Sequence, residues 1–321
     1  MFKICIESKN TNKKYDVSQL VTDISYTSYM SGTSTKLEFT LIKDNVIVYH
    51  EGDAVSFYDN EIPIFYGYVF TKSINEKKEI KTSCYDQLRY LKSKQSFEFI
   101  GKSLKEIIET IANYLKLDIG YIENVPYEIQ YRNHEDESIF DIIDYHVKQA
   151  MLSTGRQIVF YDEFGKLSLK YADDLATKYI IGVESLATSY EYKTDIDNET
   201  YNIIKFIRPN SATKKADLYL AQNVDNINKW GVLQYYQVFD ENVNIEQLKE
   251  YLKMFFNYHN KVFRSLTIDA IGIAGLRGGS TVCIDIPNIG DISITKLLLV
   301  DKVSHKYKNS DHTMNLELIV R

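Results

Sequence analysis

The sequence predicts a β-rich α+β protein, in which two related β-barrel domains are separated by an α/β insert. Three observations predict this fold. The 321 residues include 26 Tyr and one Trp, and many Tyr lie in alternating runs such as FYGYVF, which are typical of strands with one exposed face. Helical periodicity is confined to a few segments. The length suits two or three domains.

Residues 1–95 are predicted to form the first barrel domain. In the run TKLEFTLIK the apolar residues Leu37, Phe39 and Leu41 alternate with polar ones, as in a strand with one buried face. The run IFYGYVFTKS follows a turn at Pro63 and is a second such strand.

Residues 96–185 are predicted to form the α/β insert. A helix over 103–116 begins with a capping box, since Glu106 stands three residues after Ser103. A second helix over about 138–152 begins at Ser138 in the same way. Two alternating arms around Gly165 then predict a β-hairpin.

Residues 186–321 are predicted to form the second barrel domain with one helix. The helix spans Ile245 to about His259, where apolar residues recur at intervals of three and four. A weak internal repeat connects this region with the first domain. EGDAVSFYDNEIPIFYGYVFTKS, from Glu51, and GGSTVCIDIPNIGDISITKLLLVDKVSH, from Gly278, both give a glycine turn, a short strand, a proline-bearing connection and a second strand.

Composition argues against several classes of function. The net charge is −6 and the basic residues do not form blocks, so direct sequence-specific binding of nucleic acid is not expected. Cys5, Cys84 and Cys283 lie far apart in apolar runs and are expected to be reduced core residues. No apolar run is long enough for a membrane span, and the N-terminus turns polar after six residues, so membrane insertion is not expected and synthesis and folding are expected in the cytoplasm.

The chemical motifs favour structural interpretations. IGKSLKE, from Ile100, lacks the first glycine of a phosphate-binding loop, and Ser103 is better explained as a helix cap. His146 and His259 have no partner at i+4 and are expected to be structural. No GxSxG motif is present, and no Cys and His form a recognisable nucleophile pattern. We therefore predict no catalytic, cofactor-binding or metal-binding residues, no cofactor and no enzymatic activity.

Several segments taken together resemble the baseplate hub proteins of contractile phage tails and phage-tail-like bacteriocins. These segments are GDAVSFYDNEIPIFYGYVF, CYDQLRYLKSKQSF, GLRGGSTVCIDIP and LLLVDKVSHKYKNSDHTMNLEL. The resemblance implies tube-type barrels and a homotrimer at the end of the tail tube. It also implies, as partners, a trimeric spike protein, a tail tube or tube-initiator protein and other baseplate proteins. Such particles assemble in the bacterial cytoplasm and are released by lysis as a virion or a phage-tail-like particle.

A duplicated barrel gives this role a physical reason. A tail tube is six-fold and a spike is three-fold, so a trimer that presents six similar barrels satisfies both symmetries. Two alternatives from other classes stay open: a phage-tail-associated cell-wall hydrolase, which would need a cleft with catalytic groups, and a carbohydrate-binding module, which would need exposed aromatic residues on one concave face.

The C-terminal stretch from Lys296 to Val320 contains the only candidate site. It is predicted to be a hairpin with its turn at residues 308–311, and His305 and His312 are expected to approach each other across it. Two histidines beside Met and Leu lack the further ligands of a zinc site, so we predict instead that Asp301, His305 and His312 form a pH-sensitive subunit contact. Strand alternation places one set of residues on the same face of the first arm: Leu299, Asp301, Val303, His305 and Tyr307. It places a second set on the same face of the second arm: His312, Met314, Leu316 and Leu318.

Overall fold

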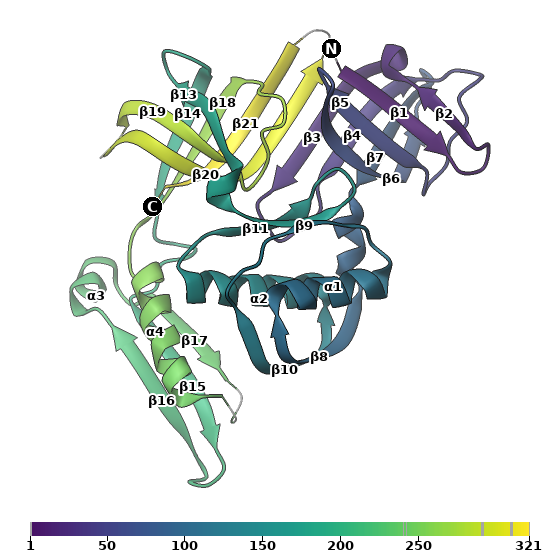
Figure 1. The fold of residues 1–321 in the computed structure, drawn as a ribbon. Coiled ribbons are helices and arrows are strands. Elements are labelled where there is room, and N and C mark those ends of the chain that lie inside the picture. The colour runs from purple at the N-terminus through teal and green to yellow at the C-terminus, as the bar shows by residue number, and fades with distance from the viewer. Residues whose placement is uncertain (1, 240, 242, 290–291, 309–310, 321) are drawn as a thin grey trace. The chain divides into compact units, whose positions relative to one another are not determined.

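The computed structural model describes residues 2–239, 241, 243–289, 292–308 and 311–320. For Gln247 it describes only the backbone. It divides into two compact units (Figure 1). The larger consists of the residues up to Glu191 together with Leu266–Ile319, and the smaller is Tyr192–Ser265 with the end of the chain. The two units have other boundaries than the three predicted domains. The domain boundaries at residues 95 and 185 stay a prediction. No helix among the described residues is long and apolar enough to cross a membrane.

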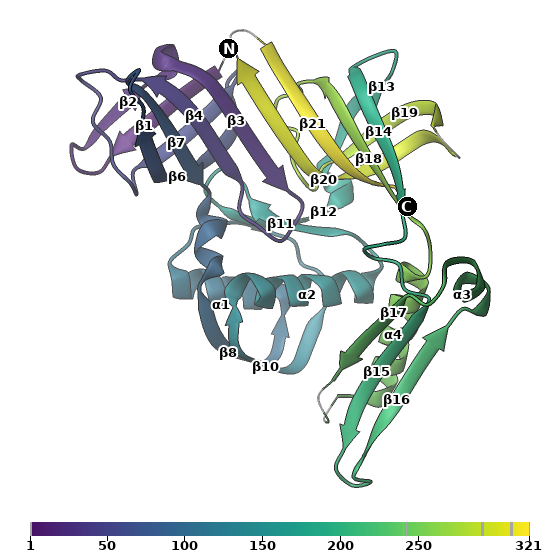
Figure 2. The ribbon, with the colours of Figure 1, turned by 180° about the vertical axis from the view of Figure 1, so that it is seen from behind.

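A 13-stranded sheet dominates the larger unit (Figure 2). Its main path runs β14-β18-β21-β20-β3-β4-β7-β6-β5-β1-β2, and β19 and β13 extend it from β20. The strands are β1 (Phe2–Ser8), β2 (Lys13–Asp16), β3 (Val21–Tyr29), β4 (Lys36–Ile42), β5 (Ala54–Asp59), β6 (Ile62–Ile74), β7 (Glu79–Tyr85), β13 (Ala176–Gly182), β14 (Ala187–Asp195), β18 (Phe263–Ile271), β19 (Thr281–Ile289), β20 (Ile292–Lys308) and β21 (Asp311–Val320).

The sheet buries one face through the alternation that the sequence predicted. Leu37, Phe39 and Leu41 of β4 are all buried and pack with side chains of neighbouring strands in one core. Three short 3-10 helices, η1 (Ser18–Leu20), η2 (Gln87–Lys92) and η3 (Ala172–Leu175), lie at strand ends. The β-rich prediction is confirmed, whereas closure into two barrels is not, because the 13 strands form one branched sheet whose ends, β14, β2 and β13, do not pair with one another among the described residues.

The insert follows η2 and has its own core. Its helices are α1 (Leu104–Leu115) and α2 (Ile139–Thr154), and its strands are β8 (Lys94–Ser103), β9 (Ile119–Ile122), β10 (Glu128–Ser138), β11 (Ile158–Asp162) and β12 (Leu167–Tyr171). Ser103 and Glu106 form the predicted capping box of α1, and Ser138 caps α2 by accepting a hydrogen bond from the Asp141 N–H. The predicted hairpin around Gly165 is the antiparallel pair β11 and β12.

The smaller unit is a three-stranded sheet with one face covered by a helix. Its elements are β15 (Ile203–Asn210), β16 (Lys215–Gln222), α3 (Val224–Trp230), β17 (Gln234–Val238) and α4 (Ile245–His259). The helix predicted from Ile245 to His259 is therefore confirmed, whereas α3 was not predicted.

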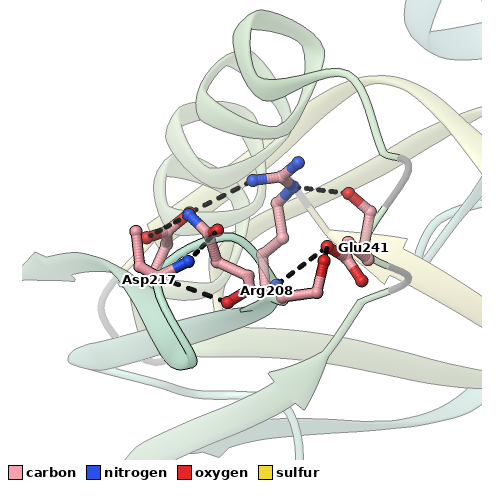
Figure 3. Close-up of polar contacts among 6 residues, drawn as sticks. Arg208, Asp217 and Glu241 are labelled. Atoms are coloured by element: carbon pink, nitrogen blue, oxygen red, sulfur yellow. Dashed lines mark hydrogen bonds and ion pairs between the residues drawn. The ribbon is translucent and has the colours of Figure 1, made fainter.

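A polar cluster holds the β15–β16 hairpin of the smaller unit to the segment after β17 (Figure 3). The Arg208 guanidinium donates from Nε to the backbone oxygen of Glu241 over 2.8 Å and from Nη1 to Asp217 Oδ2 over 3.1 Å. The Glu241 carboxylate in turn accepts from the Ser211 N–H over 2.8 Å. These contacts connect neighbouring loops within one unit, so we interpret the cluster as structural.

Candidate assembly interface

The large sheet contains the same strand arrangement twice. In the first half the neighbours run β5-β6-β7-β4-β3, and in the second half they run β19-β20-β21-β18-β14. Each series follows the same order along the chain, so β3 corresponds to β14, β4 to β18, β5 to β19, β6 to β20 and β7 to β21. The repeat suggested by the sequence is therefore present in the strand pairing.

Hydrogen bonds before β5 and β19 give a residue-level match. The Gly52 N–H donates to the Val69 oxygen over 2.7 Å, and the Gly279 N–H donates to the Val300 oxygen over 2.8 Å. Both glycines have φ +86°, a left-handed conformation that favours glycine. Gly52 and Gly279 are therefore equivalent, and each is the second residue of the two similar sequence segments, which begin at Glu51 and Gly278.

A β-bulge interrupts the same position of the long strand in each half. The register of β6 against β7 shifts between Val69 and Thr71, and the register of β20 against β21 shifts between Val300 and Lys302. Thr71 is thus equivalent to Lys302, and the residues that follow are matched in the same order.

The edge strands match through a threonine that bonds across to the next strand. The Thr22 hydroxyl donates to the Thr40 oxygen over 3.3 Å, and the Thr188 hydroxyl donates to the Asp269 oxygen over 3.1 Å. Thr188 of β14 is therefore equivalent to Thr22 of β3. Counting forward from these two residues matches Tyr190 with Ile24 and Lys193 with Thr27.

The two halves join at a seam between β3 and β20. The first part of β20 pairs with β19 as far as Leu299, and the part from Lys302 to Lys308 pairs with β3 instead. At the middle of the seam the Thr27 and Ser304 hydroxyls lie 3.2 Å apart. We call this β3–β20 pairing the internal seam.

The histidine pair lies on the buried side of the internal seam. His305 Nε2 lies 2.8 Å from the Leu276 oxygen, and His305 Nδ1 lies 2.9 Å from His312 Nε2. Because a carbonyl oxygen only accepts, His305 carries its proton on Nε2 and accepts through Nδ1 from His312. The His312 ring stacks on Tyr307 with centroids 3.9 Å apart. The predicted approach of His305 and His312 across the hairpin is confirmed; residues 309 and 310 of its turn lie outside the described residues.

Burial sets the ionisation of both histidines. His305 is 1% exposed, and burial lowers its pKa to about 4, with a smaller contribution from His312. Burial also lowers the pKa of His312, while the Asp59 carboxylate near its Nδ1 opposes this effect. A second proton on His305 would oppose two N–H groups across the 2.9 Å contact, so the neutral pair is the arrangement that this geometry favours.

The bulge corrects part of the predicted face of β20. The buried residues before it are Ile294, Leu298 and Val300, and after it they are Val303, His305 and Tyr307. Leu299 and Asp301 were predicted on the histidine face and do not lie there, because one extra residue reverses the alternation. The structure instead places Asp301 at the bulge, where its backbone oxygen accepts from the Met30 N–H and burial raises the pKa of its carboxyl.

Asp301 is thus separated from the histidines with which it was predicted to act. His305 is enclosed within the chain, whereas His312 keeps partial exposure. A subunit contact at Asp301, His305 and His312 stays a prediction.

In the internal seam β3 and β20 are neighbours of each other, but their equivalents β14 and β6 do not pair with each other among the described residues. Among the described residues, β6 beyond Val69 pairs only with β7, and β14 pairs only with β18. Ile74, equivalent to the buried His305, is 55% exposed, and Tyr190, equivalent to the 2% exposed Ile24, is 44% exposed. Sequence reasoning missed these residues, since alternation predicts which face a residue occupies but not whether its strand has a neighbour.

Around the internal seam, the face of the sheet away from the core carries many polar side chains, on β3 and β4 of the first half and on β14, β18, β20 and β21 of the second. Asp269 bonds to Ser189 and to Asn315, and charges balance locally, as in Lys36 with Glu38 and Lys302 with Glu317. Thr27 and Ser304 extend this hydroxyl-rich surface across the internal seam. The chain therefore carries a polar surface around the internal seam, with contributions from strands of both halves.

The segment YDQLRYL, residues 85–91, has a structural role. Asp86 is buried and accepts from the Thr35 N–H over 3.0 Å and from the Leu88 N–H over 3.1 Å, which fixes the start of η2. Burial, together with the nearby Asp162 carboxylate, raises the pKa of Asp86 to about 8. The segment therefore joins the first half of the sheet to the insert.

A second buried histidine pair, in the insert, was not predicted. His134 Nε2 and His146 Nε2 lie 3.0 Å apart, and His146 Nδ1 lies 3.2 Å from the Tyr127 hydroxyl. His146 is buried, which agrees with its predicted structural role. Within the part of the chain that the structure describes, no group of three or more His, Cys, Asp and Glu residues could hold a metal ion.

Comparison with known proteins places the fold. The family model described as YQBQ-like matches residues 24–319. The chain is 32% identical to "Uncharacterized protein YqbQ" of Bacillus subtilis over 84% of this chain and 81% of that protein. It is 30% identical to "Phage-like element PBSX protein XkdQ" of the same organism over 84% and 82%. A 43 kDa tail protein of prophage MuSo2 from Shewanella oneidensis shares the fold, with a TM-score of 0.74, 12% identity and coverage of 99% and 98%.

Proposed function

Because the chain belongs to the YQBQ-like family and is a phage-tail-type structural protein, we propose that it is the baseplate hub of a contractile tail or tail-like particle. In this role three copies form a ring of six half-sheets. The ring presents six similar surfaces to the hexameric tail tube and three identical ones to the trimeric spike.

The internal duplication of the sheet is the observation that carries this proposal. A chain with one sheet motif could form a six-fold ring only as six copies, whereas a chain with two equivalent motifs gives six motifs from three copies. The equivalence extends to individual backbone bonds, as Gly52 and Gly279 illustrate. The insert and the smaller unit have no counterpart in the other half, so they would give the ring its three-fold character.

The polar surface of the sheet suits the inside of such a ring. Its hydroxyl and amide groups are paired with one another, and its charges are balanced by neighbours. A passage lined in this way would exert little net attraction on a polyanion or a protein moving through it. We propose that this surface faces the lumen and that the ring is assembled in the bacterial cytoplasm before release.

Oligomeric state tests the proposal most directly. Light scattering and negative-stain electron microscopy would be applied to the purified chain over a range of concentrations, and to the chain co-expressed with its cognate spike. We expect a ring-shaped trimer with six lobes in at least the second sample. A chain that stays monomeric in both, or that hydrolyses purified cell walls with loss of activity in a single carboxylate or histidine variant, would contradict the hub role.

A further inference from the structure

We infer that β14 of one copy pairs with β6 of the next copy in the register of the internal seam. This inference rests on the proposed function and names the contact that closes the ring. The edge of β6 beyond the bulge is equivalent to the edge of β20 that β3 occupies within the chain. The strand equivalent to β3 is β14, which ends the sheet path on the other side.

The exposed residues on the two edges support this pairing. In the internal seam β3 and β20 cover each other, and Ile24 and His305 are almost fully buried. Their equivalents Tyr190 and Ile74 are large, apolar or aromatic, and roughly half exposed. A long strand edge with an exposed Ile is a site for strand addition. A second copy of this chain supplies the strand whose equivalent already fits there.

The repeat also gives the register of the contact. Ser304 faces Thr27 in the internal seam, and the equivalent residues are Ser73 of β6 and Lys193 of β14. We therefore expect Ser73 of one copy opposite Lys193 of the next, with both side chains on the polar surface. One step along, Ile74 would lie opposite Tyr192, as His305 lies opposite Tyr26.

Each copy has one edge of each kind, so the contact is heterologous. A heterologous contact closes into a ring if the rotation per step fits, and it otherwise produces an open chain. The internal seam already sets the rotation between two half-sheets. If the same rotation recurs between copies, internal seams and intermolecular seams alternate around the ring and close it.

Disulfide cross-linking tests the contact and its register. The double variant Ser73→Cys with Lys193→Cys would be oxidised in a Cys283→Ser background, in which Cys5 and Cys84 remain but are buried. We expect covalent dimers and trimers on non-reducing gels, because directly opposed residues meet the geometric requirement of a disulfide. Mixing the two single variants should give covalent dimers and nothing larger.

Two matched variants control for accidental cross-linking. Thr27→Cys with Ser304→Cys should form an intramolecular bond, since these side chains already approach to 3.2 Å. Ser73→Cys with Thr194→Cys shifts the register by one residue and places the two thiols on opposite faces. Cross-linking in this shifted pair as strong as in the Lys193 pair would overturn the inference.

A further variant separates failure of this inference from failure of the hub role. Ile74→Asp leaves the core of the single chain unchanged, because Ile74 is 55% exposed. We expect this variant to fold and to lose the ring. A ring seen by microscopy without Ser73–Lys193 cross-links, and unaffected by Ile74→Asp, would refute the seam but leave the hub role intact. A wild-type chain that never forms a ring would refute both.

Discussion

The two ends of the repeated sheet differ in one respect: one junction is closed within the chain and its equivalent is open. β3 lies against β20, and at this junction Ile24 and His305 are buried. At the equivalent positions of β14 and β6, Tyr190 and Ile74 are exposed. Since strand order, bulges and turn hydrogen bonds match in both halves, the exposure arises from the missing neighbour and not from a different local fold.

In the proposed hub role, this difference would let one chain match two symmetries. The matching strand order makes the two half-sheets alike, while the unequal junctions leave β6 and β14 each with an open edge among the described residues. The insert and the smaller unit then distinguish the halves. A chain with both junctions closed would lack the two edges that the inferred contact uses.

Truncation to alanine should have very different effects at equivalent positions of the two junctions. Ile24→Ala removes a fully buried side chain beside the internal seam and should lower the free energy of unfolding by about 2–5 kcal/mol. Tyr190→Ala at the equivalent position of β14 should change it by about 0.5 kcal/mol in the isolated chain, because the side chain is already half exposed. Urea unfolding followed by circular dichroism measures both values.

The comparison depends on the order of these two effects. If Tyr190→Ala destabilised the isolated chain as much as Ile24→Ala, β14 would already have a second neighbour, besides β18, in the single chain. In the proposed ring Tyr190 would be covered by the next copy, so Tyr190→Ala should weaken association of the copies.

The internal seam should also be sensitive to pH in a way that its equivalent is not. His305 has a folded pKa of about 4, below its ordinary value of about 6.5, so the unfolded chain binds more protons between these values. Stability should be fully present above pH 6.5 and should fall as pH drops toward 4, by up to about 3 kcal/mol from this group. Denaturant unfolding measured at intervals from pH 7 to pH 4 tests this.

His305→Gln removes the titrating group and serves as the control. It should lower stability at neutral pH through the lost packing and hydrogen bonds, yet flatten the dependence between pH 6.5 and pH 4. Ile74 occupies the equivalent position of β6 and does not titrate, so Ile74→Gln should leave the pH dependence of the isolated chain unchanged. Parallel curves for wild type and His305→Gln would assign the pH sensitivity elsewhere.

Local signals in the sequence predicted the elements whose cause is local. The capping box at Ser103 and the hydroxyl cap at Ser138 start two helices, because side chains three residues apart satisfy backbone groups without any tertiary contact. Alternation likewise predicted the buried face of β4. The approach of His305 to His312 followed from strand periodicity across one hairpin.

The features that sequence could not predict depend on partners distant in the chain. The bulge at Val300 and Lys302 reversed the face of Asp301, and nothing in KLLLVDKVSH marks an extra residue. The seam between β3 and β20 joins segments separated by most of the chain. The smaller unit was assigned to the second barrel domain because its strands alternate like the others, and only its own core, built around Phe206 and α4, distinguishes it.

The smallest expected effect concerns the smaller unit, which has no equivalent in the first half of the sheet. Arg208→Ala removes an ion pair with Asp217 and a hydrogen bond to the Glu241 backbone, and should destabilise this unit by about 1 kcal/mol. Trp230, the single Trp of the chain, lies at the end of α3, so its fluorescence reports unfolding of this unit. Lys249→Ala, which removes an exposed ion pair with Glu246 on α4, should have almost no effect. Lys193 belongs to the smaller unit but lies on β14, away in sequence from the β15–β16 hairpin that Arg208 holds. Arg208→Ala should therefore shift the unfolding transition reported by Trp230 and leave the Ser73–Lys193 cross-link unchanged. Loss of the cross-link would mean that the Arg208 cluster takes part in closing the ring.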